Sequence, residues 1–392
     1  MPEGTTVPAK CCLMTVVNTD PKCYWLTNYL ETLLVQVWYP MTVATNSREH
    51  KKIIASYFDK TGCSRDPAAS AFLSKLVDFG FRGVSSVETA ALGGAAHLCN
   101  FRATDTLAGI QMLKAYYNEL DGNFIMPGNS IPAAEHSTIT SWGRERESDA
   151  LRNMLEQYPT GLVAVVSDSY NIYEACENKW GKELKSMIEN RDGTLIVRPD
   201  SGEPKIIVVE VLEILGKAFG TSVNEKGYKM LPEYIRVLQG DGISYETLSE
   251  ILENMVANQW AADNVTFGSG GALLQKLNRD TQKCAFKCSE VTKKGGETTL
   301  VYKDPITDQG KQVLHVDPDS PSQLPMPSST QFPICHTPIG KSPGFLHTHV
   351  SHSHDLTQCE SRLVFASFLF TVEKGPADRR ARRVHREARD DH

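Results

Sequence analysis

A repeated strand–loop–helix pattern that begins at Leu162 limits most strongly the folds open to this chain. A run rich in β-branched residues, a polar or glycine-rich loop and a helical stretch follow one another four times, over 162–189, 194–219, 234–260 and 264–280. A helix between two strands returns the chain to the same edge of the sheet, so parallel strands are expected. The string CAFKCSEV at 284–291 is expected to add a fifth strand. With this many units we favour a (β/α) barrel over a doubly wound sheet.

The chain before this pattern is expected to be helical and mixed α/β. Apolar and aromatic residues recur at helical spacing from Asn18 to Val43, and Ser47–Phe58 and Ala68–Phe79 are predicted as further helices. We therefore divide the chain into a mixed part at residues 1–160, a barrel part at residues 161–312 and a tail at residues 313–392.

The tail is expected to have little order. It holds eight of the 11 His but only three of the 28 Gly. A Pro/Ser stretch, a His cluster (HTHVSHSHD), a short apolar run and a charged end follow one another without strand–helix alternation. A disordered or weakly folded tail is favoured over a functional module. Metal binding by the His cluster would be adventitious, because nothing fixes its geometry.

The composition excludes several classes of protein. The chain has 392 residues, of which 41% are hydrophobic, so it can bury a sizeable core and is not globally disordered. Ten scattered Cys are too sparse for a disulfide scaffold. Neither a secretory signal nor an apolar stretch of ~18 residues is visible, so a cytoplasmic protein without a membrane span is expected. The net charge of −6 argues against a nucleic-acid partner.

Carboxylates follow three successive strands of the repeat. Asp168, Asp200 and Asp241 each lie in the loop after a strand, and in a parallel barrel such loops share the face where active sites form. One Asp alone is as readily a turn or capping residue. Three on one face suggest Mg²⁺ or sugar hydroxyls. Arg198 and Arg279 would add positive charge for phosphate groups.

A glycine-rich string indicates a phosphate site. FGSGG, with Gly270 and Gly271, follows a strand and precedes a helix, so its backbone amides suit a phosphate, although a structural turn is the alternative. Upstream, the string DFGFRG places aromatic residues beside an arginine, and Asp105 and His136 lie in further polar strings. From these residues alone we predict a barrel enzyme that handles a phosphorylated sugar with Mg²⁺.

Long strings between about Pro2 and Pro305 also carry a resemblance to a known family. They include NTDPKCYWLTN, DFGFRGVSS, PAAEHSTIT, VVSDSY, VRPDSG, QGDG and FGSGG. The chain resembles the nicotinamide phosphoribosyltransferases. This implies transfer of 5-phosphoribosyl from phosphoribosyl pyrophosphate to nicotinamide, with ATP coupling, to give nicotinamide mononucleotide and pyrophosphate in NAD salvage. It also implies an irregular (β/α) barrel of the type II phosphoribosyltransferase kind and a homodimer that shares active sites across its interface.

The resemblance assigns roles to the upstream residues. Phe79 is implied to stack on one face of the pyridine ring and Arg82 to hold phosphate or pyrophosphate. Asp105 is implied to accept a hydrogen bond from the carboxamide. Nicotinate lacks that donor and would place two negative charges together, so selectivity for nicotinamide follows. His136 is implied to be phosphorylated by ATP in a cycle that drives the reaction towards product.

The resemblance also assigns the residues of the strand-end loops. Asp168 and Asp200 are implied to organise Mg²⁺ and ribose, and Asp200 is counted with His136 and Asp105 as catalytic. The remaining implied contacts are Arg198 in the base pocket, Gly240 and Asp241 at the ribose, Gly270 and Gly271 at the 5′-phosphate, and Arg279, Lys287 and Lys303 on the pyrophosphate side. Catalysis would then be mostly positioning and electrostatics.

The chain departs from the family pattern in several places. It begins at a segment that is internal in the family, and an irregular tail stands in place of the C-terminal elements, so a truncated barrel that is incomplete at both ends and weakly active is expected. Val77, Ala164 and Ala285 stand where the family has a His, a pocket Ser and a phosphate-side Ser. Two alternatives stay open. One is an impaired truncated or spliced product that at most binds a partner. The other is a nicotinate or quinolinate phosphoribosyltransferase, against which Asp105 speaks.

Overall fold

The computed structural model describes residues 4–7, 11–67, 71–117, 126–293, 295–301, 306–307 and 363–369. These residues form two compact units, which are described separately. The barrel unit is Val43–Leu277, and the second unit is the described part of Met1–Thr42 and Asn278–His392. Residue 160, the boundary predicted from the start of the strand–loop–helix pattern, lies inside the barrel unit. Most of the predicted tail lies outside the described residues.

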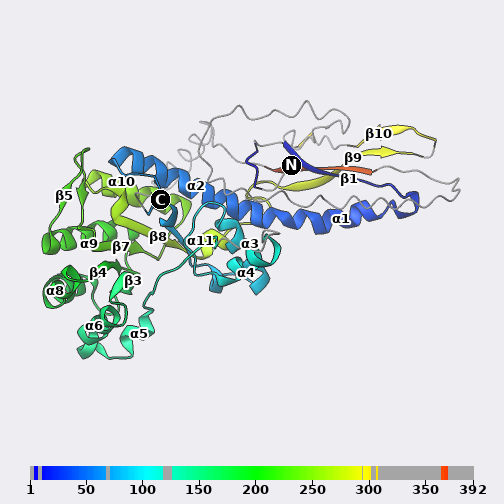
Figure 1. Cartoon of the computed structure of the whole chain (residues 1–392). Helices are drawn as coiled ribbons and strands as arrows, with labels where there is room; N and C mark the ends of the chain where they lie inside the picture. The colour runs from blue at the N-terminus through cyan, green and yellow to red at the C-terminus, as the bar shows by residue number, and fades with distance from the viewer. Residues whose placement is uncertain are drawn as a thin grey trace, which may run out of the picture. The chain divides into compact units, whose positions relative to one another are not determined.

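Five parallel strands form the main sheet of the barrel unit (Figure 1). Their order is β2 (Leu76–Asp78), β8 (Val265–Ser269), β7 (Ile235–Gln239), β4 (Asp192–Arg198) and β3 (Thr160–Val166). Every neighbouring pair is parallel. The four strands predicted from the repeat are therefore confirmed, and so is their parallel direction.

Three isolated parallel bridges connect the two edges of this sheet. They join Asp78 of β2 to Thr104, Ala103 to Asn129, and Ala133 to Ala164 of β3. Backbone hydrogen bonds of 2.7 to 3.2 Å accompany them. The pairing thus continues through single bridges from β2 round to β3, so the parallel sheet is curled, as expected for the predicted irregular (β/α) barrel.

Apolar side chains fill the interior of this curled sheet. One cluster joins residues from five segments of the barrel unit: Ala164, Ile196, Leu238, Val77, Phe79 and Ile131. Successive residues of a strand point to opposite faces, so every second residue faces inward. Two members of this cluster, Val77 and Ala164, are positions at which the resemblance implied a departure from the family.

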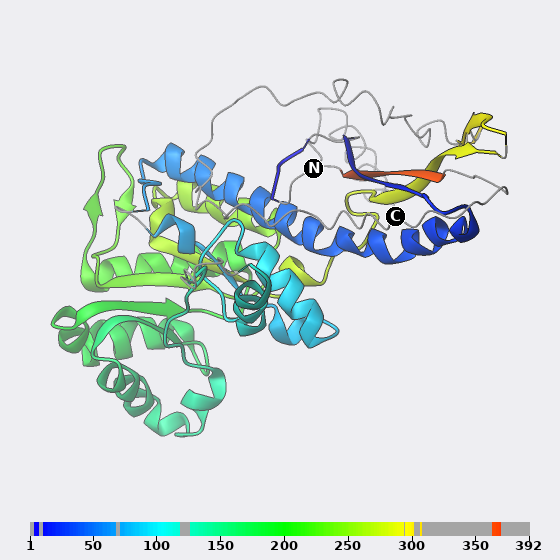
Figure 2. The same cartoon turned by 45° about the vertical axis from the view of Figure 1, so that its right-hand side comes forward.

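Helices pack on the outer face of the sheet (Figures 1 and 2). They are α2 (Trp38–Thr61), α3 (Val87–His97), α4 (Leu107–Tyr116), α5 (His136–Thr140), α6 (Glu147–Gln157), α7 (Ile172–Glu174), α8 (Lys185–Glu189), α9 (Pro204–Phe219), α10 (Tyr245–Ala257) and α11 (Gly271–Leu274). A π-helix, η6, lies between α7 and α8 at Ala175–Glu183.

Local sequence signals set the ends of the helices between the strands. At the start of α10, the Ser244 hydroxyl accepts the Thr247 N–H while the Thr247 hydroxyl accepts the Ser244 N–H, a reciprocal capping box. Pro204 opens α9, where a missing N–H costs nothing, and Gly220 follows its end with a φ of 84°. Ser244 and Pro204 thus fix where the loops before α10 and α9 end, and Gly220 fixes where α9 ends.

Several predicted helices differ from the structure. The helix predicted at Ala68–Phe79 is wrong, because β2 lies there and pairs with β8 after one 3₁₀ turn at Phe72–Ser74. In so short an apolar run, parallel pairing outweighs helical spacing. The helix predicted at Ser47–Phe58 is not separate but part of α2. The last predicted helix, within 272–280, is reduced to α11.

The second unit contains an antiparallel sheet with the order β1 (Cys11–Val17), β11 (Leu363–Leu369), β9 (Ala285–Thr292) and β10 (Thr298–Leu300). The expectation that CAFKCSEV is the fifth parallel strand is therefore wrong, because β9 belongs to this sheet and β2 completes the parallel one. Within the predicted tail, the structure describes residues 363–369, which form β11. The helical run predicted from Asn18 consists of η1 (Pro21–Cys23), α1 (Leu26–Leu34), η2 (Val35–Val37) and the start of α2.

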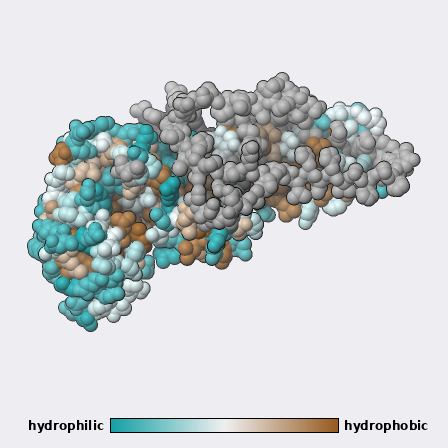
Figure 3. All heavy atoms as spheres, viewed as in Figure 1, coloured by the Kyte–Doolittle hydropathy of each residue, from teal (hydrophilic) through white to brown (hydrophobic). Residues whose placement is uncertain are grey.

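Hydrophilic and apolar residues are mixed on the face of the molecule in Figure 3. The exposed apolar side chains include Val87 and Leu107, at the starts of α3 and α4. Among the described residues, no helix has both the length and the apolar character that a bilayer crossing requires.

Candidate active site at the barrel mouth

The predicted site residues of the barrel unit gather at the carboxyl ends of its strands. We call the loops that follow β2, β3, β4, β7 and β8 the barrel mouth. Phe79 follows β2, Asp168 follows β3, Asp200 follows β4, Asp241 follows β7 and Gly270 follows β8. Because all five strands are parallel, these loops share one end of the barrel, where barrel active sites form.

Phe79 lies against two backbone positions that only glycine allows. A Cβ atom at Gly268 would lie 2.1 Å from Cε2 of the Phe79 ring, and one at Gly240 would lie 3.4 Å from it. The same Cβ at Gly240 would also lie 3.0 Å from Oδ1 of Asp200. The two glycines thus let the aromatic ring and the Asp200 carboxylate approach the strand ends together.

The predicted phosphate loop lies beside the turn that carries Arg82. A Cβ at Gly83 would lie 3.6 Å from the Gly271 amide nitrogen, and one at Gly270 would lie 3.4 Å from the Phe79 carbonyl oxygen. Arg82 is in the 3₁₀ turn η4 (Phe81–Gly83). The helix that follows the loop, α11, has only four residues. A phosphate here would therefore depend on the loop amides and Arg82 more than on a helix dipole.

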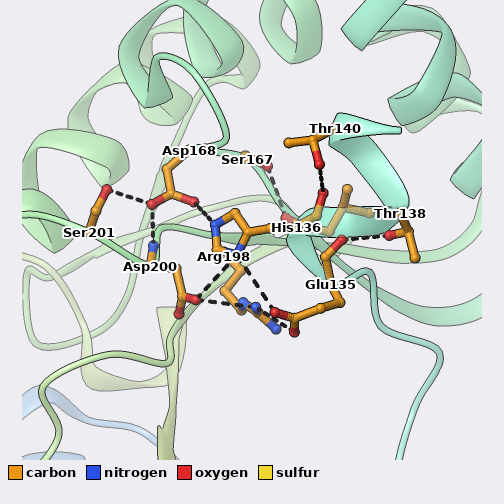
Figure 4. Close-up of polar contacts among 10 residues, drawn as sticks. Glu135, His136, Thr138, Thr140, Ser167, Asp168, Arg198, Asp200 and Ser201 are labelled. Carbon is orange, nitrogen blue, oxygen red and sulfur yellow. Dashed lines mark hydrogen bonds and ion pairs between the residues drawn. The ribbon is translucent and has the colours of Figure 1, made fainter. Parts of the chain in front are cut away.

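His136 and Asp168 form the centre of a polar network (Figure 4). The His136 Nε2 atom lies 3.1 Å from Oδ1 of Asp168, whose side chain is only 4% exposed. The other carboxylate oxygen of Asp168 accepts the Asp200 N–H (3.1 Å) and the Ser201 hydroxyl (2.5 Å). A carboxylate only accepts, so Nε2 donates, and in a neutral imidazole ring the lone pair is then on Nδ1. Nδ1 is 3.8 Å from Glu135 and 3.9 Å from Asp200, beyond hydrogen-bond distance.

Arg198 connects two acidic residues of the same network (Figure 4). Its Nη2 atom lies 3.3 Å from Oδ2 of Asp200 and 3.7 Å from Oε2 of Glu135. Burial raises the pKa of Asp200 and outweighs the lowering effect of Arg198, while Asp168 and Asp241 raise it further. The site therefore holds several carboxylates whose negative charge is only partly balanced by Arg198.

Asp105 lies at the side of the mouth, next to the segment that leads to His136. The Ser130 hydroxyl donates to Oδ1 of Asp105, and the Asp105 N–H donates to the carbonyl of Asp78 (3.0 Å). Asp78 is fully buried, and its carboxylate accepts the Gly80 N–H (2.7 Å). Burial raises the pKa of Asp78 to about 6.

Four residues of this network were given no role among the predicted site residues: Glu135, Ser130, Ser201 and Asp78. Glu135 and Ser201 are each adjacent to a residue that was identified, and Asp78 precedes Phe79, so neighbourhood in sequence was the available signal. Ser130 had none, because its link to Asp105 depends on the parallel bridge from Ala103 to Asn129.

The donor set bears on the predicted Mg²⁺ site. Among the described residues, no group of three or more His, Cys, Asp and Glu side chains is placed to hold a metal ion. Both carboxylate oxygens of Asp168 already have partners in the protein, whereas the Asp200 carboxylate accepts from Arg198 through Oδ2. Mg²⁺ commonly takes one or two carboxylates with substrate phosphates and water. The residues therefore fit Mg²⁺ that arrives with a phosphorylated substrate, with Asp200 as the protein ligand.

The basic residues predicted for the pyrophosphate side belong to the second unit or lie outside the described residues. Arg279 Nη1 donates to the Cys284 carbonyl (2.7 Å), and Lys287 Nζ lies 2.7 Å from Glu31. Lys303 is outside the described residues. Their predicted roles stay predictions.

Comparisons with known proteins show which family this chain is similar to. The model of the nicotinate phosphoribosyltransferase (NAPRTase) family matches residues 74–322. The chain is 54% identical over 314 residues to the nicotinamide phosphoribosyltransferase of Xanthomonas campestris pv. campestris, which covers 80% of this chain and 65% of that protein. Proteins of the same name from Acinetobacter baylyi and Mycoplasma pneumoniae are each 32% identical, over 79% and 80% of this chain and 64% and 68% of their own lengths.

The chain thus spans about two thirds of the length of these curated relatives, at 65% and 64% of the first two. The family match begins just before β2 and covers every strand of the barrel from there on, together with all the mouth loops. On this match and these identities, the chain belongs to the nicotinate phosphoribosyltransferase family.

Proposed function

We propose that this chain transfers 5-phosphoribosyl from phosphoribosyl pyrophosphate to nicotinamide and so makes nicotinamide mononucleotide in NAD salvage. The observation that carries the proposal is the convergence of Phe79, the Gly270–Gly271 loop and the His136–Asp168–Asp200 network at one barrel mouth. The names of the three relatives support nicotinamide as the base.

The base would bind between an aromatic face and a carboxylate. Phe79 offers its ring at the strand ends, where Gly240 and Gly268 leave space for close approach. Asp105 would accept a hydrogen bond from the carboxamide, and the Ser130 hydroxyl bonded to Oδ1 leaves Oδ2 open for this. Nicotinate would place a second negative charge against Asp105, so nicotinamide is preferred.

The ribose and phosphates would occupy the remaining loops. The amides of Gly270 and Gly271 with Arg82 would hold the 5′-phosphate and pyrophosphate, and Asp200 and Asp241 would bind ribose hydroxyls. Mg²⁺, when bound with the substrate, would neutralise charge on the pyrophosphate as it leaves. Asp200, with its raised pKa, and Arg198 would orient the sugar so that the pyridine nitrogen meets its anomeric carbon.

ATP would act through His136. Because Nε2 donates to Asp168, Nδ1 keeps its lone pair and can attack the γ-phosphorus of ATP. The bond between the γ-phosphorus and the bridging oxygen breaks, ADP leaves, and phosphohistidine forms. Its later hydrolysis would drive transfer towards product. A homodimer and a cytoplasmic location complete the proposal.

An assay of the full chain tests the proposal. The chain is incubated with radiolabelled nicotinamide, phosphoribosyl pyrophosphate and Mg²⁺, with and without ATP, and nicotinamide mononucleotide is measured. We expect product that increases with ATP, and at least tenfold lower turnover with labelled nicotinate or quinolinate. Equal or faster turnover of nicotinate would contradict nicotinamide as the substrate. No turnover of any of these bases would favour a non-catalytic chain.

A further inference from the structure

The π-helix η6 (Ala175–Glu183) contacts both segments that bring His136 and Asp168 together. Most π-helical segments are single turns, and they occur often at functional sites, so nine residues in this form need a reason. Two adjacent residues of η6, Lys179 and Trp180, contact different parts of the barrel unit. One reaches the loop after β3, and the other reaches the start of α6.

Trp180 fixes the residue before Asp168. Its indole is fully buried, and its Nε1–H donates to the Ser167 hydroxyl oxygen (3.0 Å). That hydroxyl in turn donates to the Val165 carbonyl (2.9 Å), and the Ser167 N–H donates to the Arg198 carbonyl (3.0 Å). Three hydrogen bonds therefore hold the backbone from which the Asp168 side chain reaches His136.

Lys179 fixes the segment that carries His136. Its Nζ lies 2.6 Å from Glu174 and 3.4 Å from Glu147. Glu147 is buried and is the first residue of α6, which follows α5 after one short 3₁₀ turn. Burial raises the pKa of Glu147 and Lys179 opposes this. The ion pair therefore anchors the start of α6, and with it the turn that positions His136.

The π-helical geometry is built into the packing of η6. A Cβ at Gly181 would lie 2.8 Å from the Cys176 carbonyl oxygen and 3.0 Å from the Cβ of Ala218 on α9. Gly181 thus allows the wide turn to lie close against α9. Because a π-turn contains more residues than an α-turn, it changes the directions in which Lys179 and Trp180 point.

We propose that η6 is a positioning element for the His136–Asp168 pair, in which Trp180 holds Asp168 through Ser167 and Lys179 holds the His136 segment through Glu147. Its catalytic benefit rests on the proposed function. A His whose partner is fixed by such outer contacts keeps one tautomer and one orientation. Misplacement of a reacting group by about 1 Å can lower a rate by about 100-fold.

The test compares two buried tryptophans in the full chain. Trp180→Phe keeps an aromatic ring but removes the donor to Ser167. Trp260→Phe is the matched control, because Trp260 is equally buried but its Nε1–H donates to Glu213 (2.8 Å). The ¹⁵N chemical shifts of the His136 ring report which nitrogen carries the proton. We expect one Nε2–H tautomer in the unmodified chain and in Trp260→Phe, and a mixture of tautomers in Trp180→Phe.

Phosphorylation of His136 by ATP gives a second measurement. Trp180→Phe should slow phosphorylation of His136 by about tenfold. The KM for nicotinamide should be unchanged, because the substitution disturbs the His136–Asp168 pair and not the nicotinamide pocket. An unchanged tautomer in Trp180→Phe, or the same change in Trp260→Phe, would overturn the positioning role. If Trp180→Phe does not fold, Ser167→Ala removes the acceptor of the same bond, and an unchanged tautomer there would also overturn it.

The two proposals can fail separately. The tautomer measurement needs no ATP and no substrate. Absence of phosphohistidine in the unmodified chain would therefore contradict the proposed role of His136, while the ¹⁵N shifts would still decide whether η6 positions the pair.

Discussion

The two ends of the barrel use their charged groups in opposite ways. At the amino ends of β2 and β8, here called the barrel base, Lys75 Nζ donates to the Asp263 carbonyl (2.7 Å) and lies 3.0 Å from its carboxylate, with the Lys75 side chain 4% exposed. At the mouth, His136 is 38% exposed, and its Nδ1 atom is beyond hydrogen-bond distance of Glu135 and Asp200. A buried charged group with partners in the protein, such as Lys75, belongs to the packed fold. A partly exposed group with an atom beyond hydrogen-bond distance of its neighbours, such as His136, can bind or react.

His136→Ala should have the largest effect, and it should fall on activity alone. We expect complete loss of ATP-stimulated product formation, because no ring nitrogen remains to take the phosphoryl group. The free energy of unfolding should change by no more than about 0.5 kcal/mol, since the side chain is partly exposed. Product formation with and without ATP, and urea denaturation, measure the two effects. Retained ATP stimulation would contradict the proposed role of His136, and with it the contrast between the mouth and the base of the barrel.

Lys75→Met should have the opposite effect. Removal of one partner from a buried pair leaves the other charge poorly compensated, so we expect a loss of about 3 kcal/mol in the free energy of unfolding. ATP stimulation of the folded fraction should persist. Urea denaturation at neutral pH measures the loss, with Lys182→Met, at an exposed pair 3.7 Å from Glu177, as the control. Equal losses in the free energy of unfolding in both variants would show that the buried Lys75–Asp263 pair stabilises the fold no more than an exposed ion pair.

Acid should lower the free energy of unfolding, because His97 is buried in the barrel unit. Burial lowers the pKa of His97 to about 4, while its ring nitrogens lie 2.9 Å from the Ser47 hydroxyl and 3.2 Å from the Ala103 carbonyl. Since the folded pKa is below the unfolded value of 6.5, this stability is complete above that pH and is lost as the pH falls towards about 4. The total is about 3 kcal/mol at about 1.4 kcal/mol per pH unit.

The measurement is the free energy of unfolding at about pH 7.5 and about pH 4.5, in the unmodified chain and in His97→Gln. Gln can form similar hydrogen bonds without titrating, so its pH dependence should be flatter. Burial also lowers the pKa of His50, which is present in both chains and sets the common background. Identical pH dependence of the two chains would contradict the role of His97.

Asp105→Ser should have the smallest effect, and it tests how the mouth distinguishes nicotinamide from nicotinate. We expect the preference for nicotinamide over nicotinate to fall by about tenfold, which corresponds to about 1.4 kcal/mol, because the charge that repels nicotinate is removed. The ratio of kcat/KM for the two bases measures this. Asp280→Ser, at a 76% exposed carboxylate in the second unit, is the control and should leave the ratio unchanged.

Much of the barrel could be predicted from the sequence because its signals are local. The runs that become β3, β4, β7 and β8 are β-branched and bounded by loops, and the loop residues that follow them needed no tertiary information. The sheet assignment of two strands did need it. LVDF before Gly80 was read as part of a helix, and CAFKCSEV as a parallel strand, because short apolar runs do not reveal their partners.

The site shows the same limit. Asp168, Asp200 and His136 stand out by residue type and by the strings around them, so the sequence was enough to name them as candidate site residues. It was not enough to predict their geometry. Which oxygen of Asp168 meets Nε2, and which atoms hold Asp200, follow from the way two sequence-distant loops meet at the end of the barrel.

The sequence by itself therefore determined four of the parallel strands and the loops that carry the candidate site residues, because strand patterning and turn residues act over a few positions. Only the tertiary structure decided that β2 and not β9 completes the parallel sheet, and that bridges through Thr104, Asn129 and Ala133 continue the pairing from β2 to β3. It also decided that η6 contacts Ser167 and Glu147. The physical reason is that pairing and burial depend on partners far away in the chain, and those partners are fixed only when the whole barrel packs.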